Sequence, residues 1–292
     1  WKNMKTSSKN FFTKIRWGQV FLHLIMAFLL ICMIYPLLMS VWCAFKTINQ
    51  YDISKFYPTL PLKMMNLKTA WEKISVYVYN TIAVAFFGII GSSIIASMAS
   101  FAFARMDFPG RTLFFTMVLC LMMIPGVLTL VPQFLLYKDL HLNDKLIALL
   151  IPQLTMQPIG AVFLLSMFFK GLPQELFDSA KIDGANDFQV FAKIAVPLSM
   201  PILITQAIMQ MNGIWNDYLW PMTIISTNYE ALTISSGLIV EFRNLYSQNM
   251  PVTYAGYLLS SIPLLIVFIF GNKYYIRGLL GSSIKMRGDI AL

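Results

Sequence analysis

Residues 175–197 read ELFDSAKIDGANDFQVFAKIAVP, a polar segment that separates two long apolar runs of the chain. Asp178, Ser179 and Ala180 open a spaced pattern, and Gly184 follows four residues after Ala180. The pattern closes with the sequence IAVP at residues 194–197. A simple connection between two membrane helices needs only a short turn, so this segment calls for a role of its own.

The composition places the segment in a membrane protein. The chain of 292 residues is 58% hydrophobic and only 12% charged, whereas soluble domains carry about 25% charged residues. A spanning helix needs about 20 apolar residues, and lipid leaves no alternative to helix for such runs. Six runs qualify: residues 20–42, 78–104, 112–137, 146–169, 196–225 and 253–275. The sequence therefore predicts an all-α membrane protein with six transmembrane helices.

Individual spans carry local signals. The first run is too long for a cleaved signal peptide and is expected to be retained. Pro125, in the sequence MMIPG, predicts a break in the third span. Gly88 and Gly91 in the second predict close packing against neighbouring helices. Asp217 is the one charge in the fifth.

Basic residues predict the orientation. With the N-terminus inside, the inner segments hold most of the 22 Lys and Arg residues, which satisfies the positive-inside rule. The expected parts are a cytoplasmic segment at 1–19, a six-helix domain at 20–276 that contains the polar loop 173–197, and a cytoplasmic tail at 277–292. The net charge of +9 is then explained by anionic lipid and needs no nucleic acid.

The polar loop is expected to form two short helices. Glu175 suits a helix start, and Gly184 can end that helix in a left-handed conformation. A second helix over 187–194 is expected to stop at Pro197. Ala180 and Gly184 would leave one side nearly bare. The loop holds four acidic residues and two lysines, whereas membrane-surface helices are usually basic. A protein partner is therefore favoured over a lipid surface.

The spacing of Asp178, Ser179, Ala180 and Gly184 resembles the signature loop of bacterial ABC importer permeases, the handle for an ATPase. Further stretches are similar to the second membrane subunit of carbohydrate ABC importers, the class of the maltose permease's smaller subunit. They lie at 80–84, 101–105, 108–111, 122–126, 181–185 and 215–221, and the resemblance extends over about 20–288.

This resemblance implies a type I ABC importer permease fold with a cytoplasmic coupling helix. It implies a second homologous permease subunit, two ATPase subunits that bind ATP and Mg, and an extracytoplasmic solute-binding protein. The chain would be a multi-pass protein of the bacterial inner membrane with both termini cytoplasmic. It would import a sugar or oligosaccharide, and would itself have no catalytic residues, metal or cofactor.

The resemblance also assigns residues to sites. The ATPase-docking residues would be Asp178, Ser179, Ala180, Gly184, Ala185, Ile194 and Pro197. Asp178 stands where the family usually has Glu, and Val196 where it has Leu. Residues 278–292 match a tail that contacts the ATPases in related permeases, although their sequence departs from the usual small-residue run.

Asn216, Asp217 and Tyr218 are candidates for contact with substrate or a partner, because an intramembrane carboxylate is costly and often functional. Alternatively, Asp217 reaches the membrane interface. Trp215, Tyr218 and Trp220 are interpreted as an aromatic belt at that interface.

Other functions remain open from the residues alone: an ABC permease for a non-sugar solute, an ion-coupled secondary transporter, or a membrane enzyme. The chain lacks a Gly-rich phosphate loop and any catalytic constellation. The basic residues between Lys46 and Lys73 would suit an acidic oligosaccharide, or are solvated surface charge.

Overall fold

The computed structural model describes residues 17–243 and 249–288, and side chains as far as Gly271. The predicted segment 1–19 therefore lies largely outside the described residues, as does the end of the tail. The helices are α1 (Trp17–Ala44), α2 (Ile48–Ile53), α3 (Met65–Arg105), α4 (Arg111–Met122), α5 (Gly126–Asp139), α6 (Ile147–Thr155), α7 (Gln157–Lys170), α8 (Glu175–Ile182), α9 (Asp187–Val190), the π-helix η1 (Phe191–Ala195), α10 (Val196–Asn216), α11 (Leu219–Ile224), the 3-10 helix η2 (Tyr229–Ala231), α12 (Ile234–Arg243) and α13 (Met250–Gly288).

The described residues contain helices and no strands, which confirms the all-α prediction. Five helical segments are long and apolar enough to cross a membrane, and a bent pair can supply a sixth. The pair is α4 and α5, which meet at 97°. Pro125 lies at the bend with an extended backbone, and its ring disfavours a helical conformation in Ile124, the residue before it. The predicted break in the third span is therefore confirmed.

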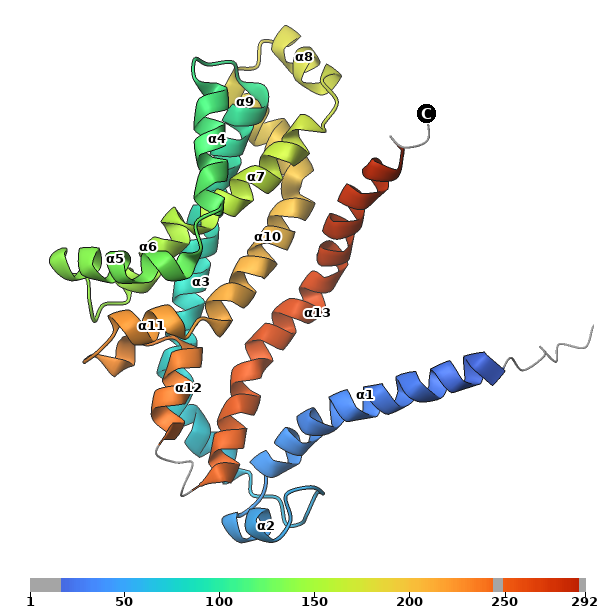
Figure 1. Ribbon diagram of the computed structural model, residues 1–292, viewed down its shortest axis with the longest axis vertical. Coiled ribbons are helices and arrows are strands. Elements are labelled where there is room, and N and C mark those ends of the chain that lie inside the picture. The colour runs from blue at the N-terminus through green and yellow to red at the C-terminus, as the bar shows by residue number, and fades with distance from the viewer. Residues whose placement is uncertain (1–16, 244–248, 289–292) are drawn as a thin grey trace, which may run out of the picture.

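The predicted fifth span, 196–225, is too long. Helix α10 ends at Asn216, and Asp217 has extended backbone angles. Residues 219–224 form the separate short helix α11, which runs across the bundle (Figure 1). A hydropathy profile joins the two because α11 is itself apolar.

Helix α3 is the centre of the bundle. It packs against α6, α7, α10, α12 and α13 (Figure 1). Gly88 allows this approach, because a Cβ added there would lie 2.8 Å from the Cβ of Gln153 on α6. The predicted close packing at Gly88 is therefore confirmed.

Two clusters of buried apolar side chains hold the bundle together. One joins α3 to α6, α11, α12 and α13, and the other joins the last turns of α3 to α7, α8 and α9. The second cluster connects the membrane helices to the polar loop.

Helix α1 lies apart from the bundle and meets α13 near the opposite end from the polar loop (Figure 1). None of its most apolar stretch is buried. Such a surface needs lipid or another protein around it.

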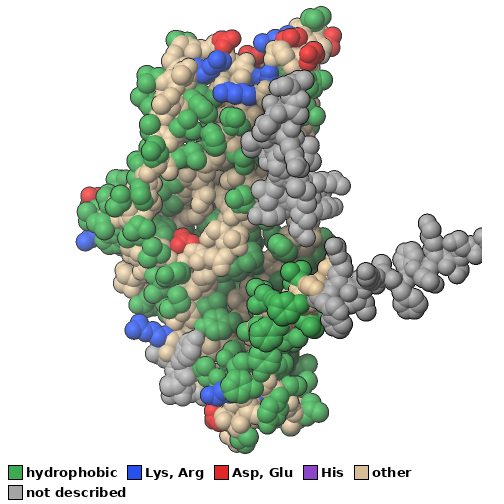
Figure 2. Space-filling view, turned by 45° about the vertical axis from the view of Figure 1, so that its right-hand side comes forward, with side chains coloured by type: hydrophobic (Ala, Val, Ile, Leu, Met, Phe, Trp, Pro, Cys, Tyr) green, Lys and Arg blue, Asp and Glu red, His purple; other side chains and the backbone are tan. Residues whose placement is uncertain are grey.

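The two ends of the bundle differ. Helices α8 and α9 lie at one end, near the C-terminal end of α13, and α2 lies at the other (Figure 1). Charged side chains gather at the α8 end (Figure 2). This is the end that the sequence predicts to be cytoplasmic, and that orientation stays a prediction.

Lys46 organises the end around α2. It is buried, and its Nζ donates to the carbonyl oxygens of Ser54 and Tyr57. Lys73, on α3, forms an ion pair with Glu241 at 2.5 Å. Lys46 therefore serves the fold and is not a solvated surface charge, and Lys73 is half-buried and paired.

Candidate functional site

The polar loop begins with α8, which starts at Glu175 as expected. The helix ends at Gly184 in the left-handed conformation, with φ of 81°. The Ala185 N–H donates to the Ala180 carbonyl at 2.9 Å, and the Gly184 N–H donates to that of Lys181 at 3.0 Å. This pair of bonds is the Schellman motif, which satisfies the last carbonyls of a helix. The prediction that Gly184 ends this helix in a left-handed conformation is confirmed.

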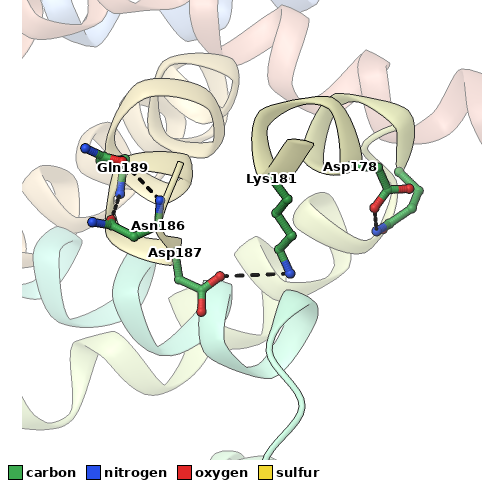
Figure 3. Close-up of polar contacts among 6 residues, drawn as sticks. Asp178, Lys181, Asn186, Asp187 and Gln189 are labelled. Atoms are coloured by element: carbon green, nitrogen blue, oxygen red, sulfur yellow. Dashed lines mark hydrogen bonds and ion pairs between the residues drawn. The ribbon is translucent and has the colours of Figure 1, made fainter. Parts of the chain in front are cut away.

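The second half of the loop differs from the prediction. The Asn186 side chain accepts the Gln189 N–H at 2.9 Å, and Gln189 Oε1 accepts the Asn186 N–H at 3.0 Å, forming a capping box (Figure 3). Helix α9 then passes through the π-helix η1 into α10 without interruption, so one helical segment runs from Asp187 to Asn216.

The expected stop at Pro197 is therefore wrong. Pro197 occupies the first turn of α10, and a π-helix precedes it. The additional residue per turn in a π-helix changes which backbone groups pair, so the ring of a proline fits without ending the helix. The second half of the loop, from Asp187, is thus continuous with a membrane span.

The predicted docking residues divide into two groups. Asp178, Ser179 and Gly184 are exposed, and a Cβ added to Gly184 would meet open space. Ala180, Ala185 and Ile194 are half-buried and pack on the second apolar cluster, the one that joins the last turns of α3 to α7, α8 and α9. Pro197 is exposed on α10. The first group forms a surface and the second fixes the loop on the bundle.

Two exposed apolar residues flank Gly184 and were missing from the sequence-based site. Ile182 is 86% exposed and Phe188 is 68% exposed. Between the helices lies a hollow of about 350 Å³, lined by residues 183–185, Gln189, Val190, Lys193 and Ile194. Apolar residues on both sides of a glycine in an otherwise polar segment were the available signal.

Two polar contacts lie on the surface of the loop. Lys181 Nζ lies 4.0 Å from Asp187 Oδ1, which connects α8 to α9 (Figure 3). Gln174 Nε2 donates to Asp178 Oδ1 at 2.9 Å. Asp178 is therefore bonded to Gln174 while its side chain stays exposed.

The second predicted group has local roles. Asn216 donates to the Asn212 carbonyl at 2.8 Å. Asp217 Oδ1 accepts the Leu219 and Trp220 N–H groups at 3.1 and 3.3 Å, so it caps α11. The cavity that Asp217 lines measures about 10 Å³, which holds at most one water molecule. Contact of this group with substrate or a partner stays a prediction.

The aromatic-belt interpretation is wrong for two of its three residues. Trp215 and Trp220 are 4% and 9% exposed. Their indole Nε1 atoms donate to the carbonyls of Ser260 and Ala148, at 3.1 and 3.0 Å. Tyr218 is 53% exposed and still fits an interface position. The tryptophans face the bundle because distant helices supply their hydrogen-bond partners.

The sequence matches, over residues 88–280, the family described as "Binding-protein-dependent transport system inner membrane component". The chain belongs to this family. The structure thus belongs to a permease, a multi-pass inner-membrane transport subunit that is not itself an enzyme.

Relatives of this permease support the assignment. It is 31% identical over 265 residues to the arabinooligosaccharides transport system permease protein AraQ of Halalkalibacterium halodurans, covering 89% of this chain and 94% of that protein. It is 29% identical to the galactooligosaccharides transport system permease protein GanQ of Bacillus subtilis, covering 91% and 95%.

A solved structure shares the fold. It is a bacterial ABC transporter involved in the import of the acidic polysaccharide alginate, with a TM-score of 0.78 and 21% identity. The likeness covers 89% of this chain and 97% of that chain. The predicted ABC importer permease fold is therefore confirmed.

Proposed function

We propose that this permease imports a sugar or oligosaccharide, together with a second homologous permease subunit, two ATPase subunits that bind ATP and Mg, and a solute-binding protein outside. The carbohydrate substrates named for the relatives AraQ and GanQ support the cargo class. The basic inner segments support a cytoplasmic location for both termini.

The loop 173–197 is proposed to be the ATPase-docking surface. The observation that carries this assignment is the open, left-handed end of α8 at Gly184, beside exposed Asp178, Ile182 and Phe188. Exposed apolar groups that surround a hollow are suited to anchor a protein partner. A carboxylate at the edge adds a partner for Arg or Lys.

The same loop can carry motion into the membrane. When the ATPases close on ATP, they would move α8 and α9, and η1 joins α9 to α10 without a flexible turn. A rigid helix transmits displacement along its length. Helix α10 would therefore move with the docked loop and alter access to the translocation pathway.

We infer a neutral rather than an acidic cargo, because part of the basic charge between Lys46 and Lys73 is engaged within the fold. The segment from Lys46 to Lys73 holds five lysines. Lys46 donates to backbone carbonyls, and Lys73 forms an ion pair with Glu241. Both cations are therefore already paired, and Lys55, Lys63 and Lys68 are the remaining lysines of this segment. Screening arabino-oligosaccharides, galacto-oligosaccharides and alginate oligosaccharides by uptake in cells that carry the whole transporter would test this expectation. Preferential uptake of alginate would contradict it.

Substitution of Gly184 tests the docking assignment. Gly184→Trp would place an indole at the docking surface, and Gly184→Ala would only strain the left-handed backbone. Gly110→Ala controls for backbone strain, because Gly110 has the same φ of 81° in another loop, although a Cβ there would also lie 3.1 Å from the Phe114 ring. We expect ATP-dependent uptake to be lost with Gly184→Trp and kept in the control. Uptake at the wild-type rate with Gly184→Trp in the membrane would refute the docking assignment.

A further inference from the structure

Arg105, the last residue of α3, reaches the base of the polar loop with its whole guanidinium group. Its Nε and Nη2 donate to the Phe169 carbonyl at 3.0 and 2.5 Å. Nη2 also donates to the Leu172 carbonyl at 2.6 Å. Carbonyls at the end of a helix lack partners within the helix, and a cation is favourable there. Arg105 thereby ties the end of α3 to the end of α7.

The same group contacts α8. The guanidinium carbon lies 4.1 Å from the centre of the Phe177 ring. Phe177 is buried and belongs to the second apolar cluster, which joins α3 to α7, α8 and α9. A guanidinium stacked on an aromatic face is held in orientation as well as in position. The first turn of α8 therefore rests on Arg105.

A hydrogen-bond chain extends from Arg105 to the exposed acid. Arg105 Nη1 donates to Gln174 Oε1 at 2.5 Å, and Gln174 Nε2 donates to Asp178 Oδ1 at 2.9 Å. Arginine has only donors, so the amide oxygen of Gln174 must face it. The amide nitrogen then faces Asp178. The orientation of the Asp178 carboxylate is set by a residue that does not belong to the loop.

We propose that Arg105 is the positioning residue of the docking surface: through Gln174 it orients the Asp178 carboxylate toward the ATPase. It also makes the last turn of α3 part of the moving unit. This inference rests on the proposed ATPase docking. It deepens that proposal by naming a residue outside the signature loop that determines how tightly the ATPase binds.

A lysine is not equivalent at this position. A single ammonium group cannot reach Phe169, Leu172 and Gln174 in one plane while it stacks on Phe177. Arg105→Lys keeps the charge and removes the fork. Arg111 offers a matched control, because its guanidinium bonds to Met106 and Asp107 on the same inner face.

The test is a double-mutant cycle on the assembled transporter in lipid nanodiscs, with ATPase affinity as the readout. The variants are Arg105→Lys, Gln174→Leu, Asp178→Asn and the two pairs that include Asp178→Asn, with Arg111→Lys as control. Gln174 is exposed, so Gln174→Leu cuts the chain without disturbing the core. Thermal unfolding reports on the fold separately.

We expect each single variant to weaken ATPase binding by about tenfold. Each double variant should bind the ATPase no more weakly than the weaker of its two single variants, because the coupling energy between contacting residues is of the same size as these losses. Additive losses would overturn the positioning role, as would wild-type affinity in Gln174→Leu. The Gly184→Trp variant separates the two proposals. If it leaves binding unchanged, the docking assignment itself fails. If it abolishes binding while the cycle is additive, only the role of Arg105 fails.

Discussion

Asp144 joins the α5–α6 connection to the chain at 226–228, and its substitution should lower the free energy of local unfolding there. The residue lies between α5 and α6, and its Oδ1 accepts the N–H groups of Ser226, Thr227 and Asn228 at 2.6, 2.7 and 3.3 Å. Its own N–H donates to the Ile224 carbonyl at 3.2 Å. These bonds fix the chain that follows α11.

The magnitude follows from replacing a charged acceptor by a neutral one. A hydrogen bond to a charged group contributes about 1.5–3 kcal/mol and a neutral one about 1 kcal/mol. Asp144→Asn keeps one oxygen and the left-handed backbone, φ 59°, which asparagine tolerates. Because the carboxylate is half-exposed, we expect a loss of about 1.4 kcal/mol, or about tenfold in local opening. Asp144→Ala should cost at least about 1–2 kcal/mol more, because alanine supplies no acceptor and is strained in the left-handed conformation.

Hydrogen exchange measured on the Ser226, Thr227 and Asn228 amides is the assay. At pH 7 their protection should fall about tenfold in Asp144→Asn, while amides in the middle of α3 stay unchanged. Equal protection in the variant and the wild type would refute the reasoning, since the bonds would then contribute nothing.

The pH dependence has a definite sign. Backbone hydrogen bonds, that from Thr227 first, lower the pKa of Asp144. A depressed pKa means that the stabilisation is complete above the unfolded value of about 3.9 and is lost as the pH falls below it. The difference in thermal stability between the wild type and Asp144→Asn should therefore be constant from pH 7 to 5 and narrow below pH 4.

Two substitutions test the packing. Gly88→Ala should destabilise the protein by about 1–3 kcal/mol in a denaturant titration, because its Cβ would lie 2.8 Å from that of Gln153. Gly160→Ala is the control and should behave as wild type, because a Cβ at Gly160 meets open space. Lys46→Met should cost about 2 kcal/mol by leaving buried carbonyls unpaired. Residues 48–64 should then be cleaved faster by a protease than in the wild type, whereas Lys55→Met, at an exposed lysine, should leave the cleavage rate unchanged. Equal cleavage rates in the two variants would contradict this.

Much of the site was accessible from local sequence. The start of α8 at Glu175 and its left-handed end at Gly184 depend on residues within a few positions of each other. So does the break at Pro125. Such features follow from backbone sterics and caps, and no distant contact is needed to produce them.

The error at the tryptophans occurred because distant contacts decide their position, and the error at Pro197 because an irregular helix precedes it. A polarity pattern identifies Trp215 and Trp220 only as amphipathic aromatics, and their partners Ser260 and Ala148 lie on other helices. Pro197 reads as a helix end locally, yet a π-helix carries the chain through it.

The sequence by itself determined the class of the protein, its all-helical architecture, and the place and left-handed helix end of its polar loop. Length, apolar content and glycine or proline positions act locally, so they can be read along the chain. Only the tertiary structure decided that Arg105 underlies Asp178, that Lys46 is buried, and that α4 and α5 meet at 97°. Those outcomes depend on which helix faces reach one another, and that is a property of the packed bundle.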